Sequence, residues 1–310
     1  ESPQSRCVIG VARGDVTPPV GIYHRMWGAA THDRSTGVHR PLTATALYLE
    51  NLHAADDFQV VVALDHCLLS REEMDCVRQR AAAGAELPCE RFVFLFSHTH
   101  GAGLMGYERR DLPGGDLIPP YLERLGDEVA ALTRRGRDTK QPASIVYGYG
   151  RCSLAANRDY RDEARQQYVC GYNPGGVADD TVLVARVTGR DSRPLATIVN
   201  YACHPTTLAW ENTLISPDYV GAMREVVEAA TGAPCLFLQG ASGDLGPREG
   251  FVGDVAVTDR NGRQLGHAAL AALEAMPPAD MAFEYAGPVI SGATLGIWKY
   301  VPAGDDRRRA

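Results

Sequence analysis

The sequence predicts an α/β (mixed α+β) protein in which helices flank mixed β-sheets. Short apolar runs of strand length alternate with amphipathic stretches of helical period along the chain. With 310 residues, of which 45% are hydrophobic and 22% charged, the chain has the size and composition of a globular protein with one large core or two small ones. Helices that follow strands after short connections indicate that part of the sheet is parallel.

The predicted elements follow one another in a regular order. Eight apolar segments are predicted to be strands, namely residues 8–12, 43–49, 59–64, 92–96, 144–149, 181–187, 196–202 and 235–238. Helices are predicted for residues 71–83, 119–134, 218–230 and 258–276. Residues 17–40 and 158–180, rich in Gly, Pro, Asn and Tyr, are predicted to be surface loops, which at this length are often functional. Residues 284–310 are predicted to begin as a strand leading out of the domain.

Charge and cysteine patterns argue against several kinds of partner and site. The formal net charge is -7, and Lys and Arg are scattered except at residues 307–309, so we expect no nucleic-acid partner. No run reaches the ~18 apolar residues of a membrane span, so we expect no transmembrane segment. The cysteines are dispersed and include no Cys-x-x-Cys pair, which predicts buried free thiols and no structural zinc cluster.

Two histidines follow the strand predicted at residues 92–96. Alternate residues of an extended chain point to one side, so His98 and His100 are expected to face one pocket. Gly101 and Gly103 permit a sharp turn and a close approach of a ligand to the backbone. Taken alone, this segment fits either a metal site or two histidines that are hydrogen-bonded at the surface.

A third histidine follows the strand predicted at residues 196–202. Pro205, which comes after His204, closes the strand ladder. In α/β sheets ligands gather beyond the carboxyl ends of strands, so histidines at two strand ends are expected to converge. Because neutral imidazole is a common zinc ligand, the sequence predicts a metal site at strand carboxyl ends that includes His98 and His204.

The strand predicted at residues 235–238 runs into a glycine-rich loop that contains Asp244. Its carboxylate is expected either to orient a ligand histidine or to cap the turn. The loop lacks the Gly-Lys-Ser/Thr ending of a phosphate-binding loop, so no nucleotide site is indicated. Ser97 and Ser242 offer hydroxyls for a serine hydrolase, but no Gly-x-Ser-x-Gly motif accompanies them.

These three segments, in this order, resemble the amino-terminal catalytic domain of the neutral/alkaline ceramidases, zinc-dependent amidases that release fatty acid from ceramide. The resemblance extends through most of the chain, and six motifs in one order are more specific than any one of them. The motifs are Gly10-Val11-Ala12-Arg13-Gly14-Asp15-Val16-Thr17-Pro18, Met26-Trp27-Gly28-Ala29-Ala30, Gly37-Val38-His39, Ala156-Asn157-Arg158, Asn200-Tyr201-Ala202-Cys203-His204-Pro205-Thr206 and Gly243-Asp244.

The resemblance implies one Zn²⁺ per chain with His98 and His204 as metal ligands. It implies catalytic roles for His100, Arg158 and Asp244, and substrate binding by Gly28 and Arg158, while water activated by the metal attacks an acyl carbonyl. Neutral His100 suits proton delivery to the leaving nitrogen. Arg158 suits stabilisation of the oxyanion or binding of a polar head group, and a surface ion pair is its structural alternative.

Some positions depart from the family pattern. Gly246 stands where the family has a serine beside the site, Arg248 stands in place of an asparagine, and Gly101 stands where serine is frequent. The family's other zinc ligands, a glutamate and a tyrosine, lie further downstream. Residues 1–310 are expected to end before them and before the immunoglobulin-like carboxy-terminal domain. Either another segment completes the site, or the polypeptide is metal-poor and inactive.

The sequence therefore predicts a zinc-dependent hydrolase of C–N (amide) bonds. Its expected partner is a small-molecule or lipid N-acyl substrate, and ceramide is one member of that set. The alternative is a non-catalytic binding or scaffold protein that retains the ceramidase-like fold, favoured by Gly246 and by the missing ligands. By the resemblance a secreted or periplasmic location is possible, whereas the residues themselves decide neither compartment nor oligomeric state.

Overall fold

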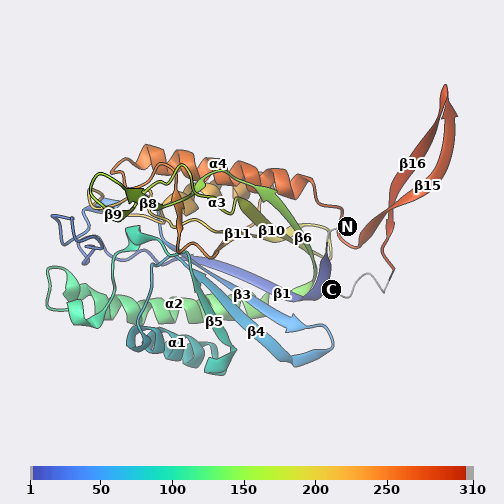
Figure 1. Cartoon of the computed structure of the whole chain (residues 1–310). Helices are drawn as coiled ribbons and strands as arrows, with labels where there is room; N and C mark the ends of the chain where they lie inside the picture. Colours follow the sequence, from blue (N-terminus) through green and yellow to red (C-terminus); the bar gives the residue numbers. More distant parts are fainter. Residues whose placement is uncertain (1–2, 305–310) are drawn as a thin grey trace.

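An eight-stranded mixed β-sheet forms the centre of the protein, whose computed structural model describes residues 3–304 (Figure 1). Across the sheet the strands follow the order β13 (Cys235–Gln239), β11 (Pro194–Tyr201), β10 (Thr181–Gly189), β6 (Gln141–Arg151), β1 (Gln4–Asp15), β3 (Thr43–Asn51), β4 (Ala54–Leu64) and β5 (Phe92–Phe96). Each of the eight strands overlaps a segment that the sequence predicts to be a strand.

Only the outermost pairs on each side of this sheet are parallel. β4 pairs with β5 and β11 pairs with β13 in parallel, whereas the other neighbours are antiparallel. A helix crosses over between the strands of each parallel pair, as such a connection requires. These helices are α1 (Arg71–Ala85) and α3 (Tyr219–Thr231), and each half adds a further helix, α2 (Ile118–Asp138) or α4 (Val255–Glu274). The predicted class, mixed sheets flanked by helices, is confirmed.

The strand order follows the same pattern on both sides of the central pair of β1 and β6. Outward from β1 the strands are β3, β4 and β5, and outward from β6 they are β10, β11 and β13. In each half the chain runs through three antiparallel strands, a crossover helix, a parallel edge strand and a second helix. The protein is thus built from two halves of the same topology, although the sequence shows no obvious repeat.

The sheet folds over, so that its two halves face each other. One apolar cluster joins residues from opposite ends of the sheet, including Ala63 on β4 and Leu236 on β13. β13 also contacts both β4 and β5. Two other clusters lie between each half-sheet and its helices. The result is four layers, with α3 and α4 over one half-sheet and α1 and α2 under the other (Figure 1).

Burial on both faces explains why the strands are apolar throughout. On β4, Val60, Val62 and Leu64 belong to the cluster beneath the helices, whereas Ala63 belongs to the cluster between the half-sheets. Successive side chains of a strand point to opposite faces, so a strand covered on both sides reads as a continuous apolar run. The segment Gln59 to Leu64 has this pattern in the sequence.

Short strand pairs and single helical turns make up the long connections. The pairs are β2 (Gly37–Val38) with β12 (Leu214–Ile215), β7 (Ala155–Asn157) with β14 (Leu245–Pro247), β8 (Asp159–Asp162) with β9 (Gln167–Cys170), and β15 (Met281–Ser291) with β16 (Ala293–Pro302). The 3₁₀ turns are Cys89–Arg91, His100–Ala102, Tyr107–Arg109 and Gly115–Leu117. The predicted loop at 17–40 therefore contains β2, and that at 158–180 contains β8 and β9.

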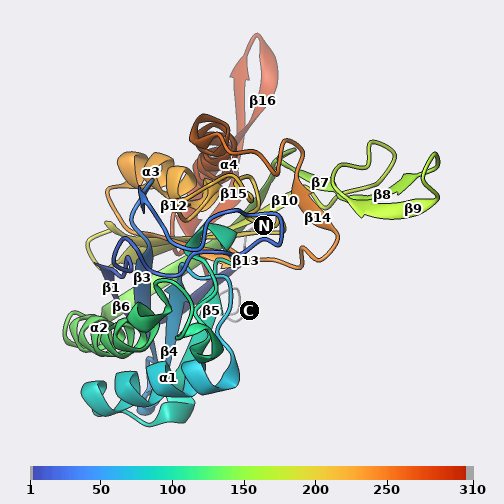
Figure 2. The same cartoon turned by 90° about the vertical axis from the view of Figure 1, so that its left-hand side faces the viewer.

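Two hairpins project from the body of the protein. The β8–β9 hairpin stands out at one side (Figure 2), and the β15–β16 hairpin extends from the end where the amino terminus lies (Figure 1). The sequence predicts a single outgoing strand from residue 284 onward. A hairpin forms instead, because Gly292 with a φ of 74° lets the chain turn back, and residues 305–310 lie outside the described part.

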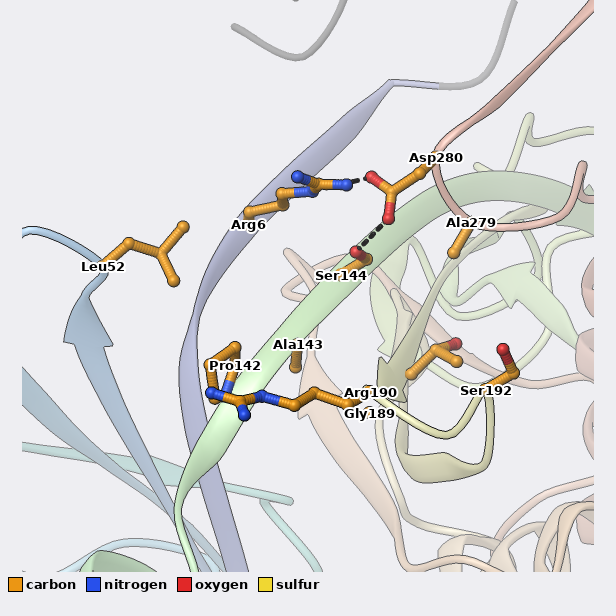
Figure 3. A pocket seen from close by; sticks show the side chains of 11 residues that line it. Arg6, Leu52, Pro142, Ala143, Ser144, Gly189, Arg190, Ser192, Ala279 and Asp280 are labelled. Atoms are coloured by element: carbon orange, nitrogen blue, oxygen red, sulfur yellow. Dashed lines mark hydrogen bonds and ion pairs between the residues drawn. The ribbon is translucent and has the colours of Figure 1, made fainter. Parts of the chain in front are cut away.

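The β15–β16 hairpin is tied to the sheet at its base. Asp280, directly before β15, accepts hydrogen bonds from Arg6 Nε on β1 at 2.8 Å and from Ser144 Oγ on β6 at 2.7 Å (Figure 3). Arg190 lies across the same pocket of about 280 Å³.

Among residues 3–304 no helix has the length and apolar character needed to cross a membrane.

Candidate functional site

Two histidines from opposite halves of the protein meet at the carboxyl ends of their strands. His98 follows β5 by two residues, and His204 follows β11 by three. Their Nε2 atoms are 3.0 Å apart, and their ring planes cross at 78°. His98 has a φ of 63°, a left-handed conformation that is costly for a residue with a side chain and that occurs often at functional sites.

The other ring nitrogen of each histidine is held by a backbone carbonyl. His98 Nδ1 donates to the carbonyl of Cys67, and His204 Nδ1 donates to the carbonyl of Ser242, each at 2.9 Å. A carbonyl oxygen only accepts, so each Nδ1 carries the hydrogen. In the neutral rings both Nε2 atoms therefore present lone pairs toward each other. Carbonyl anchoring of the distal nitrogen is the usual arrangement for metal-binding histidines.

This pair of donor atoms fits a divalent cation. Two facing lone pairs repel each other unless a proton or a cation lies between them. Zinc–nitrogen bonds of ~2.0–2.1 Å at tetrahedral angles place two ligand nitrogens ~3.3 Å apart. The observed separation of 3.0 Å is close to that value, so a small movement of either ring accommodates the ion.

The surroundings keep His100 and His204 neutral, and the neutral imidazole is the form that binds metals. Burial lowers the pKa of His204 to about 4, with a further lowering by the charges of Arg158 and His98 against an opposing effect of the Ser242 carbonyl. Burial also lowers the pKa of His100 to about 3, aided by His98, His204 and Arg158. Both rings are uncharged at neutral pH.

His100 lies beside this pair with unused hydrogen-bonding capacity. Its ring centroid is 5.2 Å from that of His98 and 5.4 Å from that of His204. Both of its ring nitrogens are buried, and neither has a hydrogen-bond partner among residues 3–304. A buried polar atom without a partner is costly and needs a functional or structural explanation. His100 is therefore a polar group available to a ligand at this site.

Cys67 offers a second possible metal group together with His98 and His100, since their ligand atoms lie within 4.8 Å of one another. The Cys67 thiol is 3.7 Å from His98 Nδ1, a nitrogen that already donates to the Cys67 carbonyl. Burial raises the pKa of this thiol to about 12, so it is protonated at neutral pH. Both arguments favour the Nε2 pair of His98 and His204 as the better-prepared donor set.

The sequence alone does not identify Cys67 as a residue of this site, and the signal for it comes from the topology. Cys67 follows the buried strand β4 by three residues, as His204 follows β11. Because the two halves share one topology, equivalent strand ends meet at the same place. Only the paired strand order, which is not visible in the sequence, makes these positions equivalent.

Arg158 lies close enough to the histidines to influence their titration. Its Nε and Nη2 donate to the carbonyl of Gly243 at 3.0 and 2.7 Å, and its backbone amide donates to the carbonyl of Asp244 at 2.9 Å. The guanidinium is thus fixed by the loop after β13. Arg158 forms no ion pair with a carboxylate of residues 3–304, so the structure does not support its alternative role in a surface ion pair.

The remaining predicted residues lie at the edge of this cluster. The Asp244 side chain is exposed, and the group that orients His204 is the Ser242 carbonyl. Gly28 is exposed and has open space where a Cβ would stand. A Cβ on Gly246 would lie 3.7 Å from Arg158 Cδ, so the position of the family serine faces the arginine.

Trp27, which belongs to one of the sequence motifs, lies beside His100, and two further aromatic side chains that the sequence does not single out pack against it. The Trp27 ring lies 5.0 Å from the His100 ring. It meets Trp210 edge-on at 6.2 Å and Phe251 edge-on at 5.6 Å, and the latter two rings are stacked at 6.3 Å. Their positions in three separate irregular segments leave no periodic pattern by which to recognise them.

Sequence comparison and structure comparison give different results. No protein-family model matches the sequence, and no curated protein matches it. The fold is similar to the crystal structure of neutral ceramidase from Pseudomonas aeruginosa, with a TM-score of 0.69 and 18% identity, over 92% of this chain and 47% of that one. It is equally similar to a ceramidase complexed with C2, with a TM-score of 0.69 and 18% identity, over 92% and 46% of the two chains.

The chain therefore spans about half the length of the solved structures that it matches. At this level of identity the similarity concerns the fold. The fold of this chain matches that of the neutral ceramidases, as its sequence motifs predict.

Proposed function

We propose that this protein is a zinc-dependent hydrolase of C–N (amide) bonds that acts on an N-acyl substrate, with His98 and His204 as metal ligands. The observation that carries the proposal is the pair of Nε2 atoms 3.0 Å apart, each on a ring whose Nδ1 is anchored to a carbonyl. The ceramidase fold supports a hydrolase, and the proposal extends this to zinc and to amide substrates.

When bound, zinc supplies a Lewis acid that polarises a carbonyl and activates water near neutral pH. Two imidazoles leave coordination positions open for water, substrate and further ligands. The residues beside the metal pair then determine how a substrate is oriented and how its protons move.

His100 is the proposed proton carrier. Its ring is neutral at pH 7 and has both nitrogens without partners, so it can take a proton at one nitrogen and deliver it to the leaving nitrogen. Contact between a reacting atom and a ring nitrogen of His100 is required for this role.

Arg158 is the proposed partner for negative charge on the substrate. Two of its nitrogens donate to the Gly243 carbonyl, which fixes the plane of the guanidinium and leaves Nη1 for a substrate oxygen. A fixed cation costs no reorganisation when charge develops on an oxyanion. Gly28, which has open space beside it, is proposed to let substrate approach the backbone, and Asp244 is proposed to support the loop that holds Arg158.

Metal retention tests the proposal directly. We expect zinc-loaded protein to hold one zinc per chain after dialysis, measured by inductively coupled plasma mass spectrometry, and His98→Ala or His204→Ala to hold less than about a tenth of that, since removing one of two imidazoles removes half the donor set. His53→Ala is the matched control, because His53 is an exposed histidine on the β3–β4 turn. Full zinc occupancy in either site variant would refute the assignment.

The alternative is a binding or scaffold protein that keeps the fold without the chemistry. Gly246 favours it, because this position beside Arg158 lacks the hydroxyl that the family supplies. The two functions make different predictions for zinc-supplemented protein. Zinc retention with hydrolysis of an N-acyl compound supports the enzyme, and protein that holds no zinc supports the scaffold.

A further inference from the structure

One face of the projecting β15–β16 hairpin has no charged residue. Residues paired across two strands, and alternate residues along each strand, point to the same face. This face, the aromatic face of the hairpin, consists of Phe283, Tyr285, Pro288, Ile290, Thr294, Gly296, Trp298 and Tyr300. Ring contacts confirm the arrangement, since the Phe283 ring lies 4.9 Å from that of Tyr300 and the Tyr285 ring lies 5.7 Å from that of Trp298. Glu284 and Lys299, the only charged residues of the two strands, lie opposite each other on the other face.

The aromatic face is open to solvent over an area that suits a protein interface. Its largest side chains are 44–75% exposed, namely Phe283, Tyr285, Ile290, Trp298 and Tyr300. Contiguous apolar patches of more than a few hundred Å² are rare on monomers and mark interaction sites. Aromatic side chains present ~150–250 Å² each, so at half exposure the whole face offers roughly 700 Å². This area is close to the ~800 Å² that each partner buries in a stable interface of standard size.

The layout of the aromatic face suits a second copy of itself. The four rings lie in the half of the hairpin nearer its base, and Ile290 lies near the tip. When two hairpins pack face to face in opposite directions, the apolar tip of each covers the rings of the other. The hairpin extends away from the body of the protein (Figure 1), so in this arrangement the two bodies lie at opposite ends and do not collide. The same surface then serves both copies, as a two-fold axis requires.

A lipid surface fits the hairpin less well than a second copy does. Among residues 3–304 no other strand lies beside the outer edge of β15 or of β16. The backbone N–H and C=O groups of these edges have no strand to pair with, and hydrocarbon cannot satisfy such groups. A dimer that covers only the aromatic face leaves both edges, and the face with Glu284 and Lys299, in contact with water.

We propose that two copies of this chain associate through the aromatic faces of their β15–β16 hairpins, packed in opposite directions about a two-fold axis. The hairpin leaves the sheet at the end where β1 and β6 begin, as the bonds of Asp280 to Arg6 and Ser144 show. His98 and His204 follow the opposite ends of their strands. The dimer therefore leaves the candidate metal site open, and this inference does not depend on the proposed hydrolase function.

Sedimentation velocity over a concentration series tests the proposal with a matched pair of variants. We expect the wild type to reach twice the 33.5 kDa mass of one chain. Ile290→Lys places a charge on the aromatic face, and Ile297→Lys places the same charge on the other face of the same hairpin. Because each change occurs twice in a two-fold dimer, Ile290→Lys should raise the Kd of the dimer about 100-fold or more. Ile297→Lys should change the Kd by less than about threefold.

Three results would overturn the proposal. The first is a wild type that stays monomeric at about 100 µM, and the second is equal weakening by the two variants, which would mean that the aromatic face is not the contact. The third is a monomeric wild type that floats with phosphatidylcholine vesicles, which would assign the face to a lipid surface. Circular dichroism checks that both variants keep the wild-type fold. Trp298→Ala, which removes a ring without adding a charge, should raise the Kd about tenfold and gives a second test if Ile290→Lys misfolds.

Discussion

A buried ion pair joins the two halves of the protein behind the histidine pair. Arg224 on α3 donates from Nη1 to Asp65 Oδ1 at 3.0 Å and from Nη2 to Asp65 Oδ2 at 2.5 Å. The side chains are 9% and 1% exposed. Asp65 follows β4 directly and lies two residues before Cys67, whose carbonyl orients His98. Breaking the pair is therefore predicted to affect both stability and the site.

The size of the effect follows from burial. Removing one partner of a buried pair leaves the other charge without compensation, which costs about 3–5 kcal/mol. At ~2 °C per kcal/mol for a domain of this size, Arg224→Met is predicted to lower Tm by roughly 6–10 °C. Asp65→Asn should have a similar effect. The double variant should recover part of the loss, because no unpaired charge then remains.

The same pair makes a defined contribution to acid stability. Burial alone would raise the pKa of Asp65, but the charge and hydrogen bonds of Arg224 and the amide of Thr43 outweigh it, so the pKa lies below its usual value. A lowered carboxyl pKa contributes stability above the unfolded-state pKa of ~3.9 that is lost as pH falls through the folded-state value. Asp65→Asn should therefore flatten the decline of stability below about pH 4.

Thermal and urea unfolding of wild type, both single variants and the double variant provide the measurement. Guanidinium salts are avoided because they screen ion pairs. A single variant that melts within about 2 °C of wild type would refute the reasoning, since it would mean that the pair behaves as a solvated one. Additive single effects in the double variant would likewise show that the two charges do not interact.

Two further predictions concern backbone packing and pH. Gly10→Ala should destabilise the protein by about 2 kcal/mol or more, because the new Cβ would lie 1.7 Å from the Gly136 carbonyl oxygen. Gly136→Ala is the control and should be tolerated, since its Cβ would have its nearest contact at 3.4 Å. Urea unfolding that finds Gly136→Ala the less stable variant would contradict the prediction. Burial raises the pKa of Asp218 to about 6, against opposing hydrogen bonds from Leu208 and Tyr219. Since the folded state then binds the extra proton, stability should fall by up to ~3 kcal/mol as pH rises from about 4 to 6, and Asp218→Asn should abolish that slope in melts across this range.

The sequence contains enough local information to predict the elements and their ends. The strand predicted at 92–96 coincides with β5, and the helix predicted at 71–83 coincides with all but the last two residues of α1. Apolar runs of strand length and amphipathic helical periods are local patterns, so they survive without knowledge of the partners. The placement of His98 and His204 directly after strands follows from the same patterns.

Strand pairing and the folding-over of the sheet were not predictable in this way. A short apolar run indicates that β1 is a strand, but it does not indicate that β6, more than a hundred residues later, lies beside it. The outgoing strand predicted from residue 284 is present as β15, but the sequence does not indicate that the chain turns back and pairs with it as β16. The stacking of the Trp210 and Phe251 rings likewise depends on contacts between irregular segments.

The two-fold arrangement of the halves explains why the candidate metal site lies where it does. Each half presents one imidazole, held by a carbonyl from the neighbouring strand end of the same half: Cys67 after β4 holds His98 after β5, and Ser242 after β13 holds His204 after β11. Neither half alone has the pair, so a metal bound there links the halves and stabilises the folded chain in proportion to RT ln(1 + [L]/Kd). Zinc should consequently raise the Tm of the wild type. It should leave the Tm of His98→Ala and of His204→Ala unchanged, because each variant has lost one of the two imidazoles of the pair.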